Sequence, residues 1–371
     1  MGKTYFGQKM PETPAPQYDP DYEPGKRHIK KKKRKSKRVV MFVAEAIVLL
    51  ILVLVLFVWF KLSKMETVSI PKSDLVVNSE IDEAEQKVLK SYTNIALYGV
   101  DSREGFIDSD THSDALMIAS INNKTKEIKL VSVYRDTYLD NTNGEYRKAT
   151  ECYYFGGPSR SMSMLNKNLD LDIDKYVTVD FNVVADVVDL IGGVEIEVGS
   201  DEIDLLNGYQ AEGSAVTGKE IVQVTSTGLQ TLNGLQALSY CRIRYTDGYD
   251  FRRTERQREV LNQIFAKASR MDLLTLNEII DTVLPDVSTN LNVLDILSLA
   301  KDIASYSMGE STGFPFNQVS ATINGSSVVV PVNLAENVRQ LHEWMFGSTE
   351  YTPSATVQEI SNQIIAATGI Q

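Results

Sequence analysis

The chain has 371 residues, of which 43% are hydrophobic and 23% charged, so it can bury a sizeable core in one or two domains. Its formal net charge is -11, but residues 1–38 hold twelve Lys or Arg against four Asp or Glu, which leaves -19 for the remainder. That acidic remainder excludes nucleic acid as the main partner, because binding to phosphate backbones requires a basic surface.

The N-terminal segment predicts a membrane anchor. Residues 1–38 form a predicted cytoplasmic tail, in which the first 25 residues read as disordered and the basic run Lys30–Arg38 comes last. The apolar run Val39–Phe60 follows; as a helix it would be about 33 Å long, enough to cross a bilayer. No small-residue cleavage site follows it, so a removed signal peptide is disfavoured. Since basic flanks stay in the cytoplasm, we expect a single-pass protein of the bacterial cell membrane, with its N-terminus inside and its main domain outside.

Beyond the expected transmembrane helix, we predict a stalk over residues 61–90 with a helical piece near 80–90, a domain over residues 91–346, and a C-terminal tail over residues 347–371. Segments in which apolar and polar residues alternate, and short continuous apolar segments, predict five strands, two of which form a hairpin. These strands are Ile95–Val100, Ala115–Ile121, Ile128–Tyr134, Tyr176–Phe181 and Val194–Val198.

Helical periodicity predicts eight helices in the same region. They are Pro158–Leu169, a helix capped by Asn182 and stopped by Gly192-Gly193, Gly234–Cys241, Arg252–Ala268, Leu273–Val283, Val293–Tyr306, Leu334–Phe346 and Val357–Ala367. Strands interleaved with helices indicate an α/β fold, a layered α-β-α sandwich with a central mixed sheet, preceded by one transmembrane helix.

Several common sites are missing from the sequence. The two cysteines, Cys152 and Cys241, and the three histidines do not have zinc-ligand spacing. Whether the cysteines pair or stay as buried thiols is left open, since the outer compartment permits disulfides. No nucleophile elbow or hydrolase triad is present.

Two aspartates mark a candidate metal site. Asp101 directly follows the first strand, and Asp114 directly precedes the second. Carboxylates at strand ends often face a ligand crevice. Mg²⁺, or Mn²⁺, is typically held by one or two carboxylates together with phosphate oxygens and water. The alternative is that both are ordinary turn or cap residues.

Arginines gather in one stretch of an otherwise acidic domain: six lie between Arg242 and Arg258. Arg242 and Arg244 would share a side of an extended segment, and Arg253, Arg256 and Gln257 would share a helix face. One guanidinium group can bind two phosphate oxygens at once. A solvated helix face paired with Glu255 and Glu259 explains Arg252 and Arg258, but it does not explain Arg242 and Arg244.

Three further basic residues join this set. Arg103 lies in the same cluster as Asp101, Arg135 follows a strand, and Lys148 is the weakest candidate. For Arg135, the alternative is a salt bridge to Asp136 or Asp140. Two carboxylates and several arginines suit a metal-bridged diphosphate, where they would neutralise charge on the transferring and leaving phosphates.

At these residues the chain resembles the LytR–CpsA–Psr family of cell-wall ligases. The resemblance runs from Thr93 to Ala268. Besides the charged clusters, it rests on Asp180-Phe181, Leu190-Ile191-Gly192-Gly193-Val194, Leu232-Asn233-Gly234 and Ala237-Leu238. It implies a phosphotransferase that moves a glycopolymer, such as teichoic acid or capsule, from an undecaprenyl-diphosphate carrier to peptidoglycan. It also implies an apolar tunnel that holds the polyprenyl chain, and it implies membrane lipid as a partner.

The resemblance also implies roles for individual residues. Asp101 and Asp114 would bind Mg²⁺. The diphosphate would be held by Arg103, Arg135, Lys148, Arg242, Arg244, Arg253 and Gln257. Asp250 would orient the arginines or act on the acceptor, and we group it with Asp101, Arg135, Arg242 and Arg244 as catalytic.

The chain departs from the family pattern at three places. Histidine replaces the usual first arginine in His112-Ser113-Asp114, and tyrosine replaces the usual first proline in Tyr134-Arg135-Asp136. The third motif reads Lys148-Ala149-Thr150 instead of the usual Lys-Ile-Asn. The arginine missing at 112 removes one phosphate donor. The altered motifs favour a second hypothesis, a non-catalytic scaffold that binds lipid-linked wall precursors, whereas the intact aspartates and arginines favour the enzyme. A third hypothesis, pyrophosphatase activity on the lipid diphosphate, needs the same site with water as acceptor.

Overall fold

The computed structural model describes residues 66–101, 111–245 and 249–371. The expected cytoplasmic tail, the transmembrane helix Val39–Phe60 and Arg103 therefore lie outside the described residues. Among the helices that are described, none combines the length and the apolar character needed to cross a bilayer.

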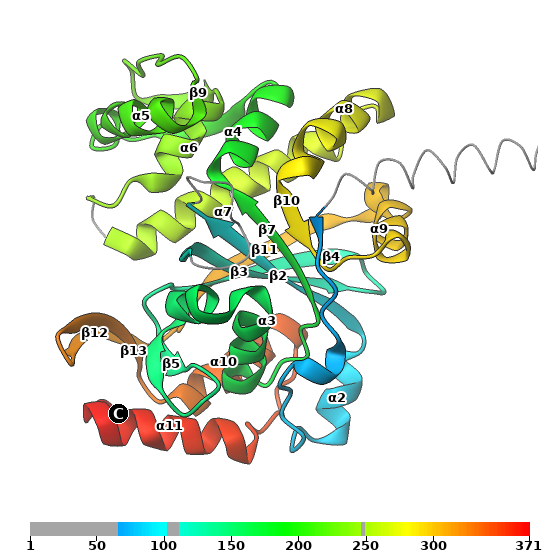
Figure 1. Ribbon diagram of the computed structural model, residues 1–371, viewed down its shortest axis with the longest axis vertical. Coiled ribbons are helices and arrows are strands. Elements are labelled where there is room, and N and C mark those ends of the chain that lie inside the picture. The colour runs from blue at the N-terminus through cyan, green and yellow to red at the C-terminus, as the bar shows by residue number, and fades with distance from the viewer. Residues whose placement is uncertain (1–65, 102–110, 246–248) are drawn as a thin grey trace, which may run out of the picture. The chain divides into compact units, whose positions relative to one another are not determined.

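A seven-stranded mixed sheet lies at the centre of the domain (Figure 1). β2 pairs antiparallel with β3 but parallel with β7, so the predicted mixed sheet is confirmed. In spatial order the strands are β1 (Glu66–Thr67), β10 (Val287–Thr289), β7 (Lys175–Asp180), β2 (Tyr92–Val100), β3 (Ser113–Asn122), β4 (Glu127–Val133) and β11 (Ser307–Phe314).

Three two-stranded ribbons accompany this sheet. They are β5 (Tyr138–Asp140) with β6 (Tyr146–Lys148), β8 (Val194–Val198) with β9 (Gly228–Leu232), and β12 (Gln318–Ile323) with β13 (Ser326–Pro331).

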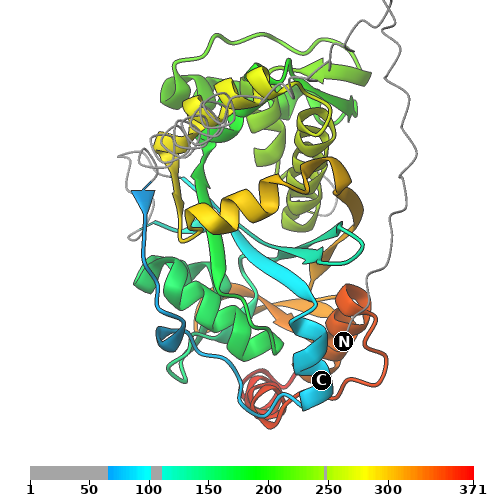
Figure 2. The same ribbon diagram turned by 90° about the vertical axis from the view of Figure 1, so that its right-hand side faces the viewer.

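Helices cover both faces of the sheet, as Figures 1 and 2 show. One layer contains α4 (Phe181–Leu190), α5 (Ile203–Thr217), α6 (Gly234–Arg242), α7 (Tyr249–Ala268) and α8 (Leu273–Val283). The opposite layer contains α3 (Ala149–Leu169), α10 (Leu334–Phe346) and α11 (Ala355–Thr368). The other α-helices among the described residues are α2 (Glu83–Leu89) and α9 (Val293–Ala300).

The alternation of side chains along β2 explains why two layers form. Ala96, Tyr98 and Val100 are buried in the main core with α3, α10 and α11. Ile95 and Leu97 point to the other face, where a smaller cluster includes Leu261 of α7. Because successive strand residues point to opposite faces, one apolar strand supplies both cores.

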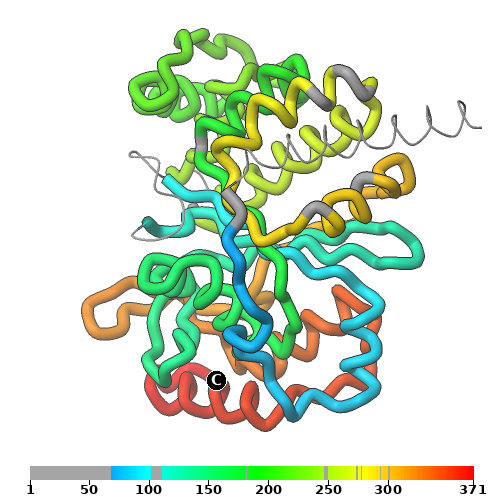
Figure 3. The backbone as a smooth tube through the Cα atoms, turned by 45° about the vertical axis from the view of Figure 1, so that its right-hand side comes forward, coloured from blue at the N-terminus to red at the C-terminus, as the bar shows by residue number. Residues whose placement is uncertain are grey.

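Segments far apart in the sequence close the domain (Figure 3). β1 pairs with β10, more than 200 positions away. On the other side, the buried His342 of α10 makes a 2.6 Å contact with Glu85 of α2 through Nδ1, and a 2.8 Å contact with the Leu169 carbonyl through Nε2. Its ring stacks on Tyr351, with centroids 3.9 Å apart. Buried polar groups need such partners. The contacts of His342 join α2 and α10, which come from the two ends of the sequence of this domain, to the end of α3.

Many predicted elements are confirmed. The hairpin is β3 with β4, and the bounds of α8 and α10 match the prediction. The expected domain boundaries stay predictions, although Val357, Ile360 and Ile364 of α11 are buried in the main core.

Other predicted details are wrong. The cap of α4 is Asp180, whose carboxylate accepts from the N–H of Val183 at 2.9 Å, and not Asn182. α9 ends at Ala300 and gives way to a short 3-10 turn, rather than running to residue 306.

The helix α5 has no counterpart in the prediction. Its sequence contains two glycines and little apolar periodicity, and both features oppose a helix on sequence grounds. Packing explains it: a Cβ on Gly213 would lie 2.7 Å from Leu235 Cδ1 of α6. Glycine at this position lets the two helices approach closely, and that tertiary gain outweighs the low helix propensity.

Candidate functional site

Asp101 and Asp114 lie together where β2 ends and β3 begins. The ladder pairs Gly99 with Ala115 but Val100 with Ser113, so Asp114 is an extra residue on β3, a β-bulge. Bulges redirect side chains and occur often beside active sites. Both aspartates line two neighbouring cavities, one of about 500 Å³ and one of about 200 Å³. We call these the site cavity and the arginine pocket.

Arg135 reaches Asp114 from the end of β4. Its guanidinium pairs with the Asp114 carboxylate, and its Nε lies 3.9 Å from Asp136. Burial opposes its charge, but Asp114, Asp136 and Asp250 outweigh burial and raise the pKa of Arg135. The expected pairing with Asp136 is therefore present at long range, while Asp114 is the closer partner.

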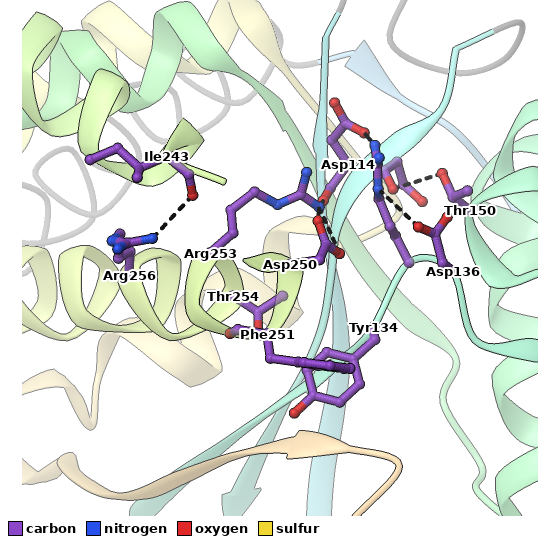
Figure 4. A network of polar contacts seen from close by, with 12 residues as sticks. Asp114, Tyr134, Asp136, Thr150, Ile243, Asp250, Phe251, Arg253, Thr254 and Arg256 are labelled. Carbon is purple, nitrogen blue, oxygen red and sulfur yellow. Dashed lines mark hydrogen bonds and ion pairs between the residues drawn. The ribbon is translucent and has the colours of Figure 1, made fainter. Parts of the chain in front are cut away.

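Arg253 of α7 points at the same carboxylate cluster (Figure 4). It is only 2% exposed, and its Nη2 donates to the Asp114 carbonyl at 3.1 Å and lies 3.2 Å from Asp250. Burial lowers the pKa of Arg253 to about 10. Its buried Nε has no hydrogen-bond partner within the described chain. A buried guanidinium N–H without a protein partner can donate a charge-assisted hydrogen bond to an anion.

Asp250 thus orients an arginine, one of the two roles expected of it. Its carboxylate lies within 3.4 Å of Arg253 through both oxygens. The next residue, Phe251, meets the Tyr134 ring edge-on, with centroids 4.6 Å apart. Tyr134 occupies the position where the resemblance expects proline, and it anchors the start of α7 to the end of β4.

Arg256 and Arg258 do not join the site. Arg256 is 1% exposed and holds Glu202 at 2.8 Å, while its Nη1 donates to the Ile243 carbonyl at 3.1 Å. Arg258 is 6% exposed, so the expectation of a solvated position for it is wrong. That expectation is confirmed for Arg252, which pairs with Glu255 at 2.9 Å. Arg253 and Arg256 point apart in Figure 4.

The arginine pocket is lined by Arg242, Arg244, Arg253 and Gln257. The predicted extended segment is only half right, because Arg242 is the last residue of α6 and the chain leaves the helix at Ile243. Both arginines nevertheless reach the pocket. Arg242 contacts Glu212 at 3.1 Å. Gln257 Oε1 is buried without a hydrogen-bond partner within the described residues.

An apolar cavity of about 240 Å³ adjoins the arginine pocket. Cys241 and Gln257 line both spaces. The rest of the apolar cavity is lined almost entirely by side chains of the sheet and of α4, α6 and α7: Leu97, Met117, Val177, Val179, Val184, Leu238, Val260, Leu261 and Ile264. A charged pocket thus lies directly beside an apolar one.

Lys148 lies on the other side of the site cavity, at the end of β6. Its ammonium pairs with Asp136 at 3.0 Å. The following Thr150 donates to the Ser113 carbonyl at 2.9 Å, and its N–H donates to the Arg135 carbonyl at 2.9 Å. These bonds fix the start of α3 against both the bulge and the arginine, so Lys148-Ala149-Thr150 supports the site through both side-chain and backbone contacts.

His112 also lines the site cavity. Its ring stacks on Tyr154, with centroids 4.9 Å apart and planes 14° apart. An imidazole ring therefore occupies the position where the resemblance expects an arginine side chain.

Sequence reasoning missed several wall residues of the site cavity, namely Thr111, Asp136, Glu151 and Ser326. Ser326 comes from β13, and no local pattern connects it with β2 or β3. Both cysteines are free and buried, which settles the open question of their pairing for this structure. Within the described residues, no three His, Cys, Asp or Glu side chains gather as a metal site.

Comparisons of the sequence with known proteins point to one family. The LytR_cpsA_psr family model matches residues 61–342. The polyisoprenyl-teichoic acid–peptidoglycan teichoic acid transferase TagT of Bacillus subtilis is 31% identical over 61% of this chain and 70% of its own length. TagU of Enterococcus faecalis is 31% identical over 57% of this chain and 66% of its own.

A solved structure supports the same fold. The crystal structure of B. subtilis TagT, 24% identical, covers 74% of this chain and 99% of its own, with a TM-score of 0.53. The family match extends over three quarters of the sequence and includes every residue placed above in the site. The chain is therefore a member of the LytR_cpsA_psr family.

Proposed function

We propose that this chain transfers a glycopolymer, as a glycosyl phosphate, from an undecaprenyl-diphosphate carrier to peptidoglycan outside the membrane. One observation carries the proposal: the arginine pocket and the apolar cavity share Cys241 and Gln257 as wall residues. A lipid diphosphate has an anionic head on an apolar chain. An arginine-lined space beside an apolar one matches both halves of such a molecule.

Two groups of basic residues would each bind one phosphate of the diphosphate. Arg242, Arg244 and Arg253 line the pocket beside the apolar cavity, so they would bind the phosphate next to the lipid. Arg135 and Lys148 line the site cavity, so they would bind the phosphate that carries the glycan. Positive groups on both phosphates stabilise charge on the transferring group and on the leaving lipid phosphate.

Asp101 and Asp114 fit a divalent cation such as Mg²⁺ or Mn²⁺. They come from adjacent strands and line both cavities, and carboxylate oxygens are the ligands that Mg²⁺ prefers. Two protein carboxylates leave room for phosphate oxygens and water to complete the coordination. When bound, the cation would neutralise charge on the diphosphate.

The transfer itself is a displacement at phosphorus. A hydroxyl of the acceptor attacks the glycan-bearing phosphate, the bond to the bridging oxygen breaks, and the lipid monophosphate leaves toward the arginine pocket. The hydroxyl proton passes to a carboxylate of the site cavity. With water in place of the sugar hydroxyl, the same residues would hydrolyse the diphosphate, which is the proposed side activity.

The test is transfer by the full chain in lipid nanodiscs. The substrates would be an undecaprenyl-diphosphate oligosaccharide and peptidoglycan oligomers, with Mg²⁺ present. We expect product from the wild type, and a loss of about a hundredfold or more in Asp101→Asn and Arg244→Ala. Arg252→Ala is the matched control, because Arg252 pairs with Glu255 on the exposed side of the same arginine run. Tight lipid binding without product, across several glycans, would instead establish a scaffold.

A further inference from the structure

A third polar cavity of about 350 Å³ lies between the β5–β6 ribbon and the β12–β13 ribbon. We call it the hairpin groove. Its walls include Tyr138, Tyr146 and Arg147 from the first ribbon, and Ile323 and Asn324 from the second. The two ribbons lie beside each other in Figure 1, and the N–H of Val329 donates to the Asp136 carbonyl between them at 2.8 Å.

The hairpin groove adjoins the site cavity. Lys148, Glu151 and Ser326 line both spaces. The arginine pocket joins the site cavity through different residues, Asp101 and Asp114. The four spaces therefore follow one another in order: apolar cavity, arginine pocket, site cavity and hairpin groove.

This order matters for the direction of attack. In phosphoryl transfer, the attacking and leaving oxygens lie roughly in line on opposite sides of the phosphorus. Under the proposed function, the leaving lipid phosphate faces the arginine pocket. The attacking hydroxyl must then enter from the opposite side of the site cavity, which is the side of the hairpin groove.

The groove has the composition of a sugar site. The Tyr146 ring, 5.8 Å from the buried ring of Tyr138 by centroids, lines the groove, and Ile323 adds apolar surface. Arg147, Glu145 and Asn324 add donors and acceptors. Rigid aromatic surface with a few placed polar groups binds ligands that have apolar C–H faces and hydroxyl edges. Burial raises the pKa of Tyr146 to about 12, so its hydroxyl remains a donor at neutral pH.

The charge of the groove separates two possible glycans. Glu145 and Glu151 balance Arg147 and Lys148, so the lining carries no net charge. A polyanionic polymer such as teichoic acid would gain little there and would face two carboxylates. A glycan strand with stem peptides of both charges suits a balanced lining.

The groove is also held in shape. Asn324 and Gly325 have φ of 49° and 80°, which is the left-handed pair that closes a two-residue hairpin between Ile323 and Ser326. Arg147 is fixed between Glu145 at 3.3 Å, Glu151 at 3.5 Å and the Phe155 ring at 5.4 Å. A preorganised site loses less entropy when a ligand binds.

We infer that the hairpin groove binds the peptidoglycan acceptor strand and sets its attacking hydroxyl over the site cavity. This inference rests on the proposed function and deepens it. It assigns Tyr146 and Arg147 to acceptor binding, separate from the residues that hold the donor diphosphate.

Steady-state transfer by the full chain in nanodiscs tests the inference, with donor and acceptor varied separately. In Arg147→Ala and Tyr146→Ala, we expect the acceptor KM to rise about tenfold, while kcat and the donor KM stay within twofold. Hydrolysis of the donor by water should be unchanged. Arg339→Ala is the matched control, because Arg339 is also a surface arginine between two glutamates, Glu336 and Glu343, and lines none of these spaces.

Equilibrium binding provides the second arm and does not depend on turnover. Muropeptide dimers should bind the full chain in saturation-transfer NMR, and Arg147→Ala should weaken that binding tenfold, with its melting temperature unchanged. If the wild type makes no product, the proposed function fails, yet this arm still decides the role of the groove. A rise in donor KM instead would assign the groove to the donor polymer, and unchanged constants in both variants would also overturn the inference.

Discussion

The buried guanidinium of Arg253 donates a 3.1 Å hydrogen bond to the backbone carbonyl of Asp114, which is the bulged residue of β3. This bond joins α7 to the sheet at the point where the carboxylate cluster meets the arginine pocket. Arg253 therefore fixes the position of one predicted metal ligand, and its own Nε, which has no partner in the described residues, is a proposed phosphate donor.

We expect Arg253→Ala to lower transfer by about a hundredfold or more, because it removes a preorganised donor to the diphosphate. Arg253→Lys should recover only part of the rate, since an ammonium cannot reach Asp114, Asp250 and phosphate at once. Rates at saturating acceptor, together with lipid-diphosphate binding, would check this. Equal rates for alanine and lysine variants would show that the fork geometry of arginine is irrelevant.

Arg256 should behave in the opposite way, although it lies only three positions away. Its buried pair with Glu202 is 1% and 5% exposed, so Arg256→Met should cost about 3–5 kcal/mol of unfolding free energy by leaving a carboxylate unpaired. The double variant Arg256→Met/Glu202→Met should recover most of that loss. Urea denaturation measures both. The folded fraction of each variant should retain transfer, and a dead but stable Arg256→Met would contradict the purely structural role.

The two free cysteines predict a pH effect on stability. Burial raises the pKa of Cys152 and of Cys241 to about 12, from an ordinary value of 9. Above pH 9, the unfolded thiols lose protons that the folded thiols keep. Unfolding is then favoured by up to about 1.4 kcal/mol per pH unit for each thiol. The stabilisation is complete below pH 9 and is lost between pH 9 and 12.

Urea denaturation at a series of pH values would measure this loss. The double variant Cys152→Ala/Cys241→Ala provides the reference, since it lacks both thiols and should lose stability less steeply above pH 9. Parallel curves for the two proteins would show that the thiols ionise as readily when folded as when unfolded.

His112→Arg should strengthen the site. The position lines the site cavity and stacks on Tyr154, and an arginine can keep that stacking while adding a fork of N–H donors. One extra charge-assisted bond to phosphate predicts a gain on the order of tenfold in donor affinity. Donor titrations of wild type and variant would measure it, with Asn123→Arg as a control for net charge. A weaker donor affinity would mean that the histidine itself makes the better contact.

The sequence predicted the parts of this protein that depend on local pattern. The β3–β4 hairpin follows from alternation, and α8 and α10 follow from apolar periodicity. The carboxylates and arginines were found because their charge is out of place beside buried strands. Arg256 illustrates the limit: its spacing puts it near Arg253, but only the fold shows that Glu202, 54 positions earlier, takes it away from the pocket.

The hairpin groove lay beyond the reach of sequence reasoning for the same reason. Its two ribbons come from residues 138–148 and 318–331, and neither has an unusual composition. Their meeting depends on the parallel pairing of β11 with β4, a long-range contact that brings β12 and β13 to the site. α5 was missed because close helix packing, which propensity does not describe, stabilises a glycine-containing helix.

Because Asp114 is the extra residue of a bulge, the position of its carboxylate depends on the number of residues in β3. Side chains alternate between the two faces of a strand, so a chain shorter by one residue at this point would restore a regular ladder. The rest of β3 would keep its pairing and its core contacts, but the acidic group would no longer be set out by an extra residue. Under the proposed function, deletion of Asp114 alone should therefore abolish transfer while the domain stays folded.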